Sequence, residues 1–324
     1  MLIDVIRSSF AGLKINGGAT GSGSRRGKKR LLPVTRKEWM LEAVKLSGLW
    51  LLLSPLVAAP LYRWMVMHPD RTDYSYAMAN PLKLMKEHMK VSSQDVWFKT
   101  PHGERLHGLF LTKEGARKTV IVFHGNAGNI AHRLVLGTAL TLCHANVLLF
   151  DYEGFGKSEG EATLPGIVTD GLAAYDYAVR ERKLSSSDIV LYGESLGCAV
   201  ATQVSEQRKT AGVILQSPFS SLIEAGRERL VWLYTYPDSW FQDLNMNNTV
   251  AFRHKHVPLL LIHGTADEIL NKHHSEEIFA QAVEPKKLVI LEGFGHSVES
   301  IGAKPYVVAV TNFMHALDTV KAGN

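Results

Sequence analysis

The chain is predicted to fold as an α/β protein with a mostly parallel central sheet and helices on both faces. From residue 119 onward, short apolar runs typical of buried strands alternate with longer segments of helical character. This alternation indicates repeated βαβ units. Polar or glycine-rich loops follow several of the apolar runs. In an open α/β sheet, functional residues lie in the loops at the carboxyl ends of the strands.

The individual elements follow from these runs. The runs at 96–99 and 106–111 flank the turn Pro101-His102-Gly103, so an N-terminal antiparallel hairpin is expected at the edge of the sheet. A closing helix is expected at 305–320. Parallel strands are expected at 119–123, 146–150, 189–192, 212–216, 259–263 and 287–291.

A nucleophile elbow is predicted at 193–197, which reads Gly-Glu-Ser-Leu-Gly. The apolar run 189–192 precedes it, and a helical segment beginning near Cys198 follows it. A serine on a sharp turn between a strand and a helix presents its hydroxyl at the tip of the sheet. Glycines are needed on either side because a Cβ there would collide with the neighbouring strand and helix. Ser195 is therefore the candidate nucleophile.

His296 and Asp267 are the candidate base and acid. A serine hydroxyl needs an oriented base to become a good nucleophile. Each of the two residues lies just beyond a predicted strand, and the chain order Ser, Asp, His is the one that hydrolases of this sheet type use. We expect His296 to accept and return the proton and Asp267 to fix its tautomer. Three neighbouring side chains are alternatives for these roles: Glu268 for the acid, and His263 and His124 for the base.

The loop at 124–129, His-Gly-Asn-Ala-Gly-Asn, is predicted to supply part of an oxyanion hole. It follows the apolar run 119–123, and such a loop contributes one backbone donor while the residue after the nucleophile contributes the other. The expected donors are the amides of Asn126 and Leu196. A phosphate-binding loop is the alternative, but the segment lacks both the Gly-Lys-Ser/Thr ending and the Gly-x-Gly-x-x-Gly spacing.

Taken together, these motifs resemble the α/β-hydrolase superfamily. More narrowly, they resemble its membrane-anchored α/β-hydrolase-domain serine hydrolases, a group that contains carboxylesterases, protein depalmitoylases and lysophospholipid lipases. The resemblance implies an α/β-hydrolase fold, a Ser-Asp-His triad and no cofactor. After Glu268 the family usually continues with valines and a proline, whereas this chain has Ile269, Leu270 and Asn271. The matching blocks appear in family order within about 95–318, at 124–129, 151–160, 193–197, 217–221, 263–268 and 293–297.

The positive charge of the chain is concentrated in its first 45 residues. They contain ten Lys or Arg and three Asp or Glu, although the whole 324-residue chain has a net charge of only +5. The basic character therefore belongs to a leader, and no nucleic-acid-binding surface is expected. Residues 1–45 are interpreted as a disordered, cytoplasmic leader that is rich in Gly, Ser and basic residues.

Residues 46–67 are interpreted as a transmembrane signal anchor. The stretch 46–62 has no charged residue, and continuing to Met67 with a snorkelling Arg63 gives a helix long enough for a bilayer. A cleaved signal peptide would need a much shorter basic region, and a soluble amphipathic helix would need a polar face. Basic residues at 25–30 precede the span, so the N-terminus is expected in the cytoplasm and the catalytic domain on the non-cytosolic side of a single-pass membrane protein.

The rest of the chain is divided into a connecting segment, 68–94, and a catalytic domain, 95–324, with a short cap insertion near 222–257. Aromatic residues of the insertion line an acyl pocket or pack it onto the core, and packing is the default. No metal site is predicted, because the chain's histidines show no recognised ligand spacing. The candidates considered for one are His254, His256, His273 and His274.

The sequence thus predicts a membrane-anchored serine hydrolase that cleaves carboxylic esters or thioesters through an acyl-enzyme on Ser195. A serine aminopeptidase-like peptidase is the alternative within enzymes, and it would need an acidic site for a free amine. A non-catalytic, membrane-tethered interaction module on a hydrolase scaffold is the alternative outside enzymes, since fold alone does not establish activity.

Overall fold

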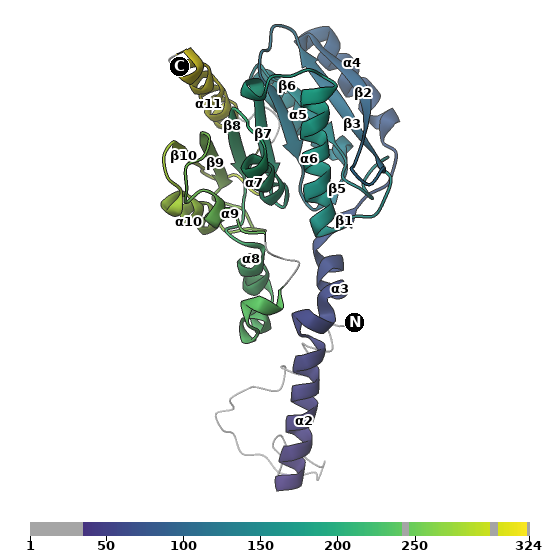
Figure 1. Ribbon diagram of the computed structural model, residues 1–324, viewed down its shortest axis with the longest axis vertical. Coiled ribbons are helices and arrows are strands. Elements are labelled where there is room, and N and C mark those ends of the chain that lie inside the picture. Colours follow the sequence, from purple (N-terminus) through teal and green to yellow (C-terminus); the bar gives the residue numbers. More distant parts are fainter. Residues whose placement is uncertain (1–34, 242–245, 299–303, 323–324) are drawn as a thin grey trace, which may run out of the picture. The chain divides into compact units, whose positions relative to one another are not determined.

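The computed structural model describes residues 35–241, 246–298 and 304–322. The chain divides between Trp50 and Leu51 into two units, of which the first contributes residues 35–50 to the described part and the second contributes the rest (Figure 1). Most of the expected basic leader, residues 1–34, lies outside the described residues. Residues 36–45 of that leader belong instead to helix α2 (Arg36–Leu52). Thr35 and Glu38 cap the start of this helix by reciprocal hydrogen bonds between side chain and backbone.

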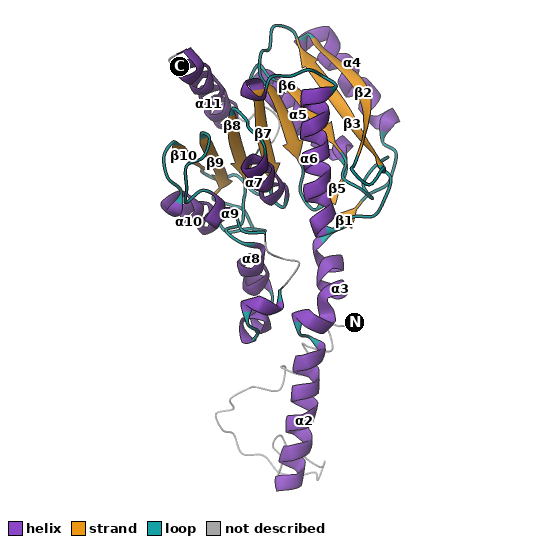
Figure 2. Cartoon of the chain, in the orientation of Figure 1, coloured by secondary structure: helices purple, strands orange, loops and turns teal. Residues whose placement is uncertain are grey.

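An eight-stranded sheet is the centre of the larger unit, with the order β10-β9-β8-β7-β4-β6-β3-β2 (Figure 2). The expected hairpin is confirmed, because β2 and β3 pair antiparallel from Val91↔Lys113 to Lys99↔Arg105. β3 is also antiparallel to β6, and all other neighbours are parallel. The strands are β2 (Val91–Lys99), β3 (Arg105–Lys113), β4 (Thr119–Phe123), β6 (Asn146–Phe150), β7 (Ile189–Glu194), β8 (Gly212–Gln216), β9 (Leu259–Gly264) and β10 (Lys286–Leu291).

Helices cover both faces of this sheet, as predicted. Successive strand residues point to opposite faces, so Ile121 packs in one apolar cluster with helices α6 and α7, while Val120 and Val122 pack in another with α4, α5 and α11. The helices of this unit are α3 (Pro55–Val66), α4 (Ser75–Met89), α5 (Leu134–Leu142), α6 (Leu164–Arg180), α7 (Gly197–Gln207), α8 (Leu222–Arg229), α9 (Asn248–Ala251), α10 (His273–Gln281) and α11 (Lys304–Ala322).

The segment expected to connect the anchor to the domain is itself folded. Helix α4 buries Met78 and Met85, seven residues apart, and ends at Lys90 in a left-handed conformation. Before it, β1 (His68–Pro69) pairs with β5 (Ala127–Gly128) in a separate two-stranded sheet. The segment that follows α3 is therefore attached to the loop after β4.

Apolar helices precede β1 in the chain. In the part of the chain that the structure describes, no single helix is long and apolar enough to cross a bilayer. Taken together as a bent pair, α2 and α3 have the length and apolar composition that a membrane span needs. Pro55 begins α3, a position that proline favours, and Pro60 lies inside the helix, where it removes a backbone donor.

Two parts of the cap insertion pack on different elements: its central part clusters with Ala58 and Tyr62 of α3, and α9 contacts α7 and α10. Within the insertion, η3 (Val231–Thr235) and η4 (Asp238–Trp240) follow α8. Tyr62 of α3 is buried in one cluster with aromatic and aliphatic residues of the insertion, and the Trp232 indole donates to the Tyr62 hydroxyl at 3.2 Å. The aromatic residues of this cluster pack the insertion onto α3, whereas the sequence default was packing onto the core, and Phe241 also lines a cavity. The buried members contributed by the insertion are Leu233, Tyr236 and Phe241.

Candidate active site

Ser195 lies on a strained turn between β7 and α7. Its φ is +54°, a left-handed value that is costly for a non-glycine residue and is often found at functional sites. The flanking glycines permit the turn: an added Cβ would lie 2.4 Å from the Cα of Cys198 at Gly193, and 1.9 Å from the Phe123 carbonyl oxygen at Gly197. The local backbone is that of the predicted elbow.

The structure brings His296 and Asp267 together. His296 Nδ1 lies 2.7 Å from Asp267 Oδ2, and the carboxylate is fully buried while the imidazole is 15% exposed. The two loops approach each other so closely at Gly264 that an added Cβ there would lie 2.1 Å from the carbonyl oxygen of Phe294. With Nδ1 facing the carboxylate, Nε2 is the ring nitrogen that remains for proton transfer.

The Asp267 carboxylate is ionised. Its burial opposes the charged form, but hydrogen bonds from His263, His296 and the Leu270 amide outweigh burial and hold its pKa well below the usual range. Oδ1 accepts from the amides of Ile269 and Leu270 at 2.8 and 2.9 Å. The carboxylate therefore has a fixed orientation and a full negative charge beside the imidazole.

The alternative acid and bases have other surroundings. Glu268 is exposed. His263 is fully buried, with Nδ1 2.7 Å from the Ser275 hydroxyl and Nε2 3.2 Å from Asp267 Oδ2. It therefore contacts the same carboxylate oxygen as His296 does. His124 is also buried, and desolvation lowers its pKa to about 3, which keeps the ring neutral.

Ser195 is connected to His296 through the backbone of β8. The Ser195 amide donates to the Gln216 carbonyl at 2.9 Å, and the hydroxyl of the next residue, Ser217, donates to the His296 carbonyl at 2.9 Å. Among the described residues, the Ser195 hydroxyl makes no hydrogen bond with the His296 imidazole. Such catalytic contacts are often long in a substrate-free site and tighten in the complex.

The predicted oxyanion donors belong to two neighbouring segments: Asn126 to the loop after β4, and Leu196 to the elbow itself. An added Cβ at Gly125 would be 3.5 Å from Ser195 Cβ, so the loop after β4 lies beside Ser195. In the described part of the chain, the amides of Asn126 and Leu196 donate no hydrogen bond to another protein group. The Asn126 side-chain amide donates to the Val66 carbonyl at 2.7 Å, and the Asn126 backbone carbonyl accepts from the His68 amide at 2.8 Å. The loop is thus held by the segment that follows α3.

An Arg133–Glu194 ion pair supports the same loop, and the sequence analysis missed it. Arg133 Nε lies 2.6 Å from Glu194 Oε2, and Nη2 donates to the Ala127 carbonyl at 3.1 Å. Glu194 precedes the nucleophile, and its side chain is 6% exposed. The only sequence signal was a charged residue inside the elbow motif, and its partner is 61 residues away.

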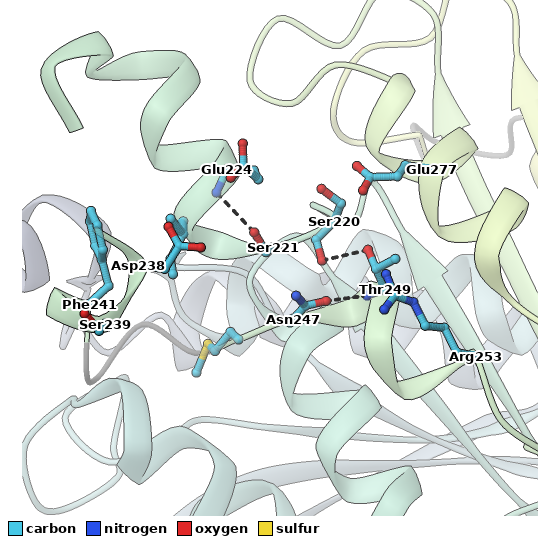
Figure 3. Close-up of a pocket in the computed structure, with 12 residues that line it drawn as sticks. Ser220, Ser221, Glu224, Asp238, Ser239, Phe241, Asn247, Thr249, Arg253 and Glu277 are labelled. Atoms are coloured by element: carbon cyan, nitrogen blue, oxygen red, sulfur yellow. Dashed lines mark hydrogen bonds between the residues drawn. The ribbon is translucent and has the colours of Figure 1, made fainter. Parts of the chain in front are cut away.

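A separate cavity of about 520 Å³ lies beside the cap insertion (Figure 3). None of the predicted site residues lines it. Two of its carboxylates, Glu224 and Asp238, already pair with Arg227 at 2.9 and 2.5 Å. Glu277 and Arg253 also line the cavity, so its acidic groups are partly neutralised.

The sequence is similar to one family model and to several known proteins. The family model described as "Serine aminopeptidase, S33" matches residues 114–255. The "Uncharacterized protein Rv2307c" of Mycobacterium tuberculosis is 34% identical over 226 residues, which cover 69% of this chain and 79% of that protein. The "Alpha/beta hydrolase domain-containing protein WAV2" of Arabidopsis thaliana is 30% identical over 209 residues, 58% of this chain and 66% of that protein.

Among solved structures, the esterase Pf2001 of Pyrococcus furiosus superimposes with a TM-score of 0.62 at 20% identity. The match covers 78% of this chain and 98% of the esterase. At that identity the similarity concerns the fold, and it agrees with the sheet order and helix layers described above.

Proposed function

The chain belongs to the α/β-hydrolase superfamily, and from this premise we propose that it is a membrane-anchored serine hydrolase that cleaves carboxylic esters or thioesters. The single observation that carries the proposal is the 2.7 Å contact between His296 and the buried Asp267 carboxylate, in loops adjoining the strained Ser195 turn. A histidine oriented by a buried acid is the arrangement that activates a serine.

In the proposed reaction, Ser195 Oγ forms a bond to the acyl carbon while its proton moves to His296 Nε2. The amides of Asn126 and Leu196 donate to the resulting oxyanion. His296 then returns the proton to the departing alcohol or thiol, which leaves the acyl group on Ser195. Water repeats the sequence with His296 as base, releasing the carboxylic acid and restoring the serine. Asp267 stays ionised throughout and stabilises the imidazolium.

The proposed membrane anchor is residues 46–67, with residues 1–45 in the cytoplasm and the catalytic domain, 95–324, on the other side. The combined length and apolar composition of α2 and α3 support it, as do the basic residues that precede them in the sequence. Fractionation of cells expressing the full chain, with protease protection of the domain in sealed vesicles, tests both the anchor and its orientation.

The decisive test of catalysis is Ser195→Ala. We expect this variant to lose turnover of p-nitrophenyl acyl esters by several orders of magnitude and to lose labelling by a fluorophosphonate probe. Its circular dichroism should match that of the wild type, because the two side chains differ by one oxygen. Unchanged turnover would refute the assignment of Ser195. Absence of labelling in the wild type would favour the non-catalytic interaction module.

A serine aminopeptidase is the second candidate, and the description of the matching family model favours it. It would need an uncompensated carboxylate to bind the free amine of its substrate. Glu224 and Asp238 do not meet this need, because Arg227 already pairs with both. Parallel assays with acyl esters and with amino-acid amides distinguish the two activities: the esterase proposal predicts turnover of the esters alone.

A further inference from the structure

Glu228, His273 and His274 form a cluster outside the candidate active site. One ligand atom from each residue lies within 4.8 Å of the other two. His273 Nε2 is 2.9 Å from Glu228 Oε1, and His274 Nε2 is 3.4 Å from Glu228 Oε2. Glu228 lies near the end of α8 in the cap insertion, whereas the two histidines begin α10. Two elements distant in sequence thus direct three potential ligands to one point.

The buried histidine of this cluster has a ring nitrogen without a hydrogen-bond partner. His274 is fully buried, and its Nε2 makes no hydrogen bond among the described residues; its contact with Glu228 is close but lacks hydrogen-bond geometry. A buried polar atom left in this state is costly unless a ligand completes it. Nε2 is directed toward Glu228 and His273, which are 36% and 48% exposed, so the site is open to solvent on one side.

The opposite nitrogen of His274 is held by a second group. His274 Nδ1 lies 3.1 Å from the Ser220 hydroxyl, which is itself buried. Metal-bound histidines usually have their other ring nitrogen fixed in this way, which sets the tautomer and the orientation of the ring. Here the contact directs the Nε2 lone pair into the cluster.

We propose that the Glu228–His273–His274 cluster binds a divalent transition-metal ion of the zinc class. Two imidazole nitrogens and one carboxylate oxygen are ligands that suit Zn²⁺. Bond lengths of about 2.0–2.1 Å in a tetrahedral site place ligand atoms about 3.3 Å apart. The two histidine nitrogens lie 2.9 and 3.4 Å from different oxygens of Glu228, Oε1 and Oε2, so the exposed carboxylate would turn to present one oxygen to the ion. Water from the exposed side would be the fourth ligand.

The ion would join the cap insertion to the helix that follows the catalytic-acid loop. Arg229, next to Glu228, already donates to the carbonyls of Glu268 and Ile269 in that loop. A metal at the cluster would add a second link between the same two segments. Its expected role is to hold the insertion against the acid loop, and it takes no part in the proposed reaction. Histidine spacing alone missed the site, because Glu228 is 45 positions before His273.

The test uses the full chain, purified in detergent micelles through an affinity tag without histidines and treated with a chelator. Cobalt(II) is titrated as the probe, and Zn²⁺ is used to displace it. We expect one cobalt per chain, visible d–d bands typical of tetrahedral coordination, and a rise in Tm of several degrees with Zn²⁺. H273Q and E228Q, which alter partly exposed side chains, should weaken cobalt binding at least about 10-fold, and S220A should do so about 10-fold.

H254Q is the matched control, since His254 is an exposed histidine outside the cluster and its loss should leave the titration unchanged. If H273Q and E228Q bind cobalt as tightly as the wild type does, the cluster is only an ion pair and the proposal is wrong. The proposal is equally wrong if the wild type gives no tetrahedral spectrum. Neither readout depends on ester turnover, so the outcome is independent of the proposed hydrolase activity.

Discussion

The two sides of the candidate active site are held in position by different kinds of interaction. On the acid–base side, hydrogen bonds fix the side chains: Asp267 receives two amides and contacts two imidazoles. On the Ser195 side, the backbone conformation fixes the position of the side chain: Ser195 has a φ of +54°, and its neighbouring glycines leave no room for a Cβ. The amides of Asn126 and Leu196 stay free of protein partners in the described part of the chain.

This difference matches the two tasks. A base must keep one tautomer through repeated proton transfers, so it needs a fixed partner on its other nitrogen. A nucleophile and its oxyanion donors must instead keep their bonding capacity for the substrate, so they are placed by backbone geometry. Substitutions on the two sides should therefore have different signatures: altered proton transfer on one, and lost stability on the other.

The largest effect is expected from Asp267→Asn, which disrupts the acid–base side. The Asn oxygen can still accept from the amides of Ile269 and Leu270, but its NH₂ group would face His296 Nδ1. That contact favours the tautomer with the proton on Nε2, which cannot accept from Ser195. We expect kcat for an acyl ester to fall by about 10³- to 10⁴-fold, with little change in KM. Glu268→Gln alters the exposed adjacent carboxylate and should leave kcat unchanged; equal losses in both variants would contradict the assignment of the acid.

Arg133→Gln disrupts the Ser195 side. It leaves the buried Glu194 carboxylate without its cation, so we expect the free energy of unfolding to fall by about 3 kcal/mol in urea titrations. The double variant R133Q/E194Q removes both charges and should regain much of that loss. Arg180→Gln is the control, since this arginine is 77% exposed and its loss should change little. If R133Q is as stable as R180Q, the ion pair does not support the oxyanion loop.

The free energy of unfolding should depend on pH because of Asp151, a buried carboxyl group whose amide donor, Ile130, follows the loop after β4. Burial raises the pKa of Asp151 to about 7, above its value in the unfolded chain. The folded state therefore holds a proton that the unfolded state releases, and stability from this group is lost as pH rises toward 7. Asp151→Asn keeps an acceptor for the Ile130 amide but does not titrate. Between pH 5 and 8, D151N should gain about 2 kcal/mol relative to the wild type.

Urea unfolding at the two pH values measures this difference. Glu87→Gln, which alters an exposed carboxylate on α4, should show no such change. A difference between D151N and the wild type that stays constant with pH would mean that Asp151 is already ionised at pH 5.

The sheet could be predicted closely because its signals are local. The strands at 119–123, 146–150 and 212–216 were located to the residue, since each is a short apolar run buried on both faces and bounded by polar or glycine-rich segments. Helix α4 was missed because Pro81 lies inside it and interrupts the helical pattern. Its stability comes from packing Met78 and Met85 against the sheet, which local sequence does not reveal.

The candidate site divides in the same way. Ser195, Asp267 and His296 could be proposed as candidates from the sequence because each follows a recognisable strand, and the fold brings the ends of parallel strands to one edge. Arg133, Ser217 and Glu228 could not be assigned, because their roles depend on contacts with residues 45 or more positions away. Motif spacing describes chain neighbours, whereas the groups that support a site come from whichever elements the fold packs beside it.

The smallest expected effect comes from Ser217, whose hydroxyl joins the two sides by donating to the His296 carbonyl at 2.9 Å. Ser217→Ala removes this hydrogen bond, so we expect the free energy of unfolding to fall by about 1 kcal/mol. We also expect a several-fold lower kcat, because the His296 loop is then held less firmly. Ser205→Ala is the matched control, since the Ser205 hydroxyl also donates to a backbone carbonyl, that of Thr202, within α7. It should keep its activity, and its stability should change little because alanine is the better helix former. Because both variants remove one hydroxyl-to-carbonyl bond, a fall in kcat for S217A alone would show that the position of His296 depends on its hydrogen bond with Ser217. Equal kcat in the two variants would mean that Asp267 suffices to place His296.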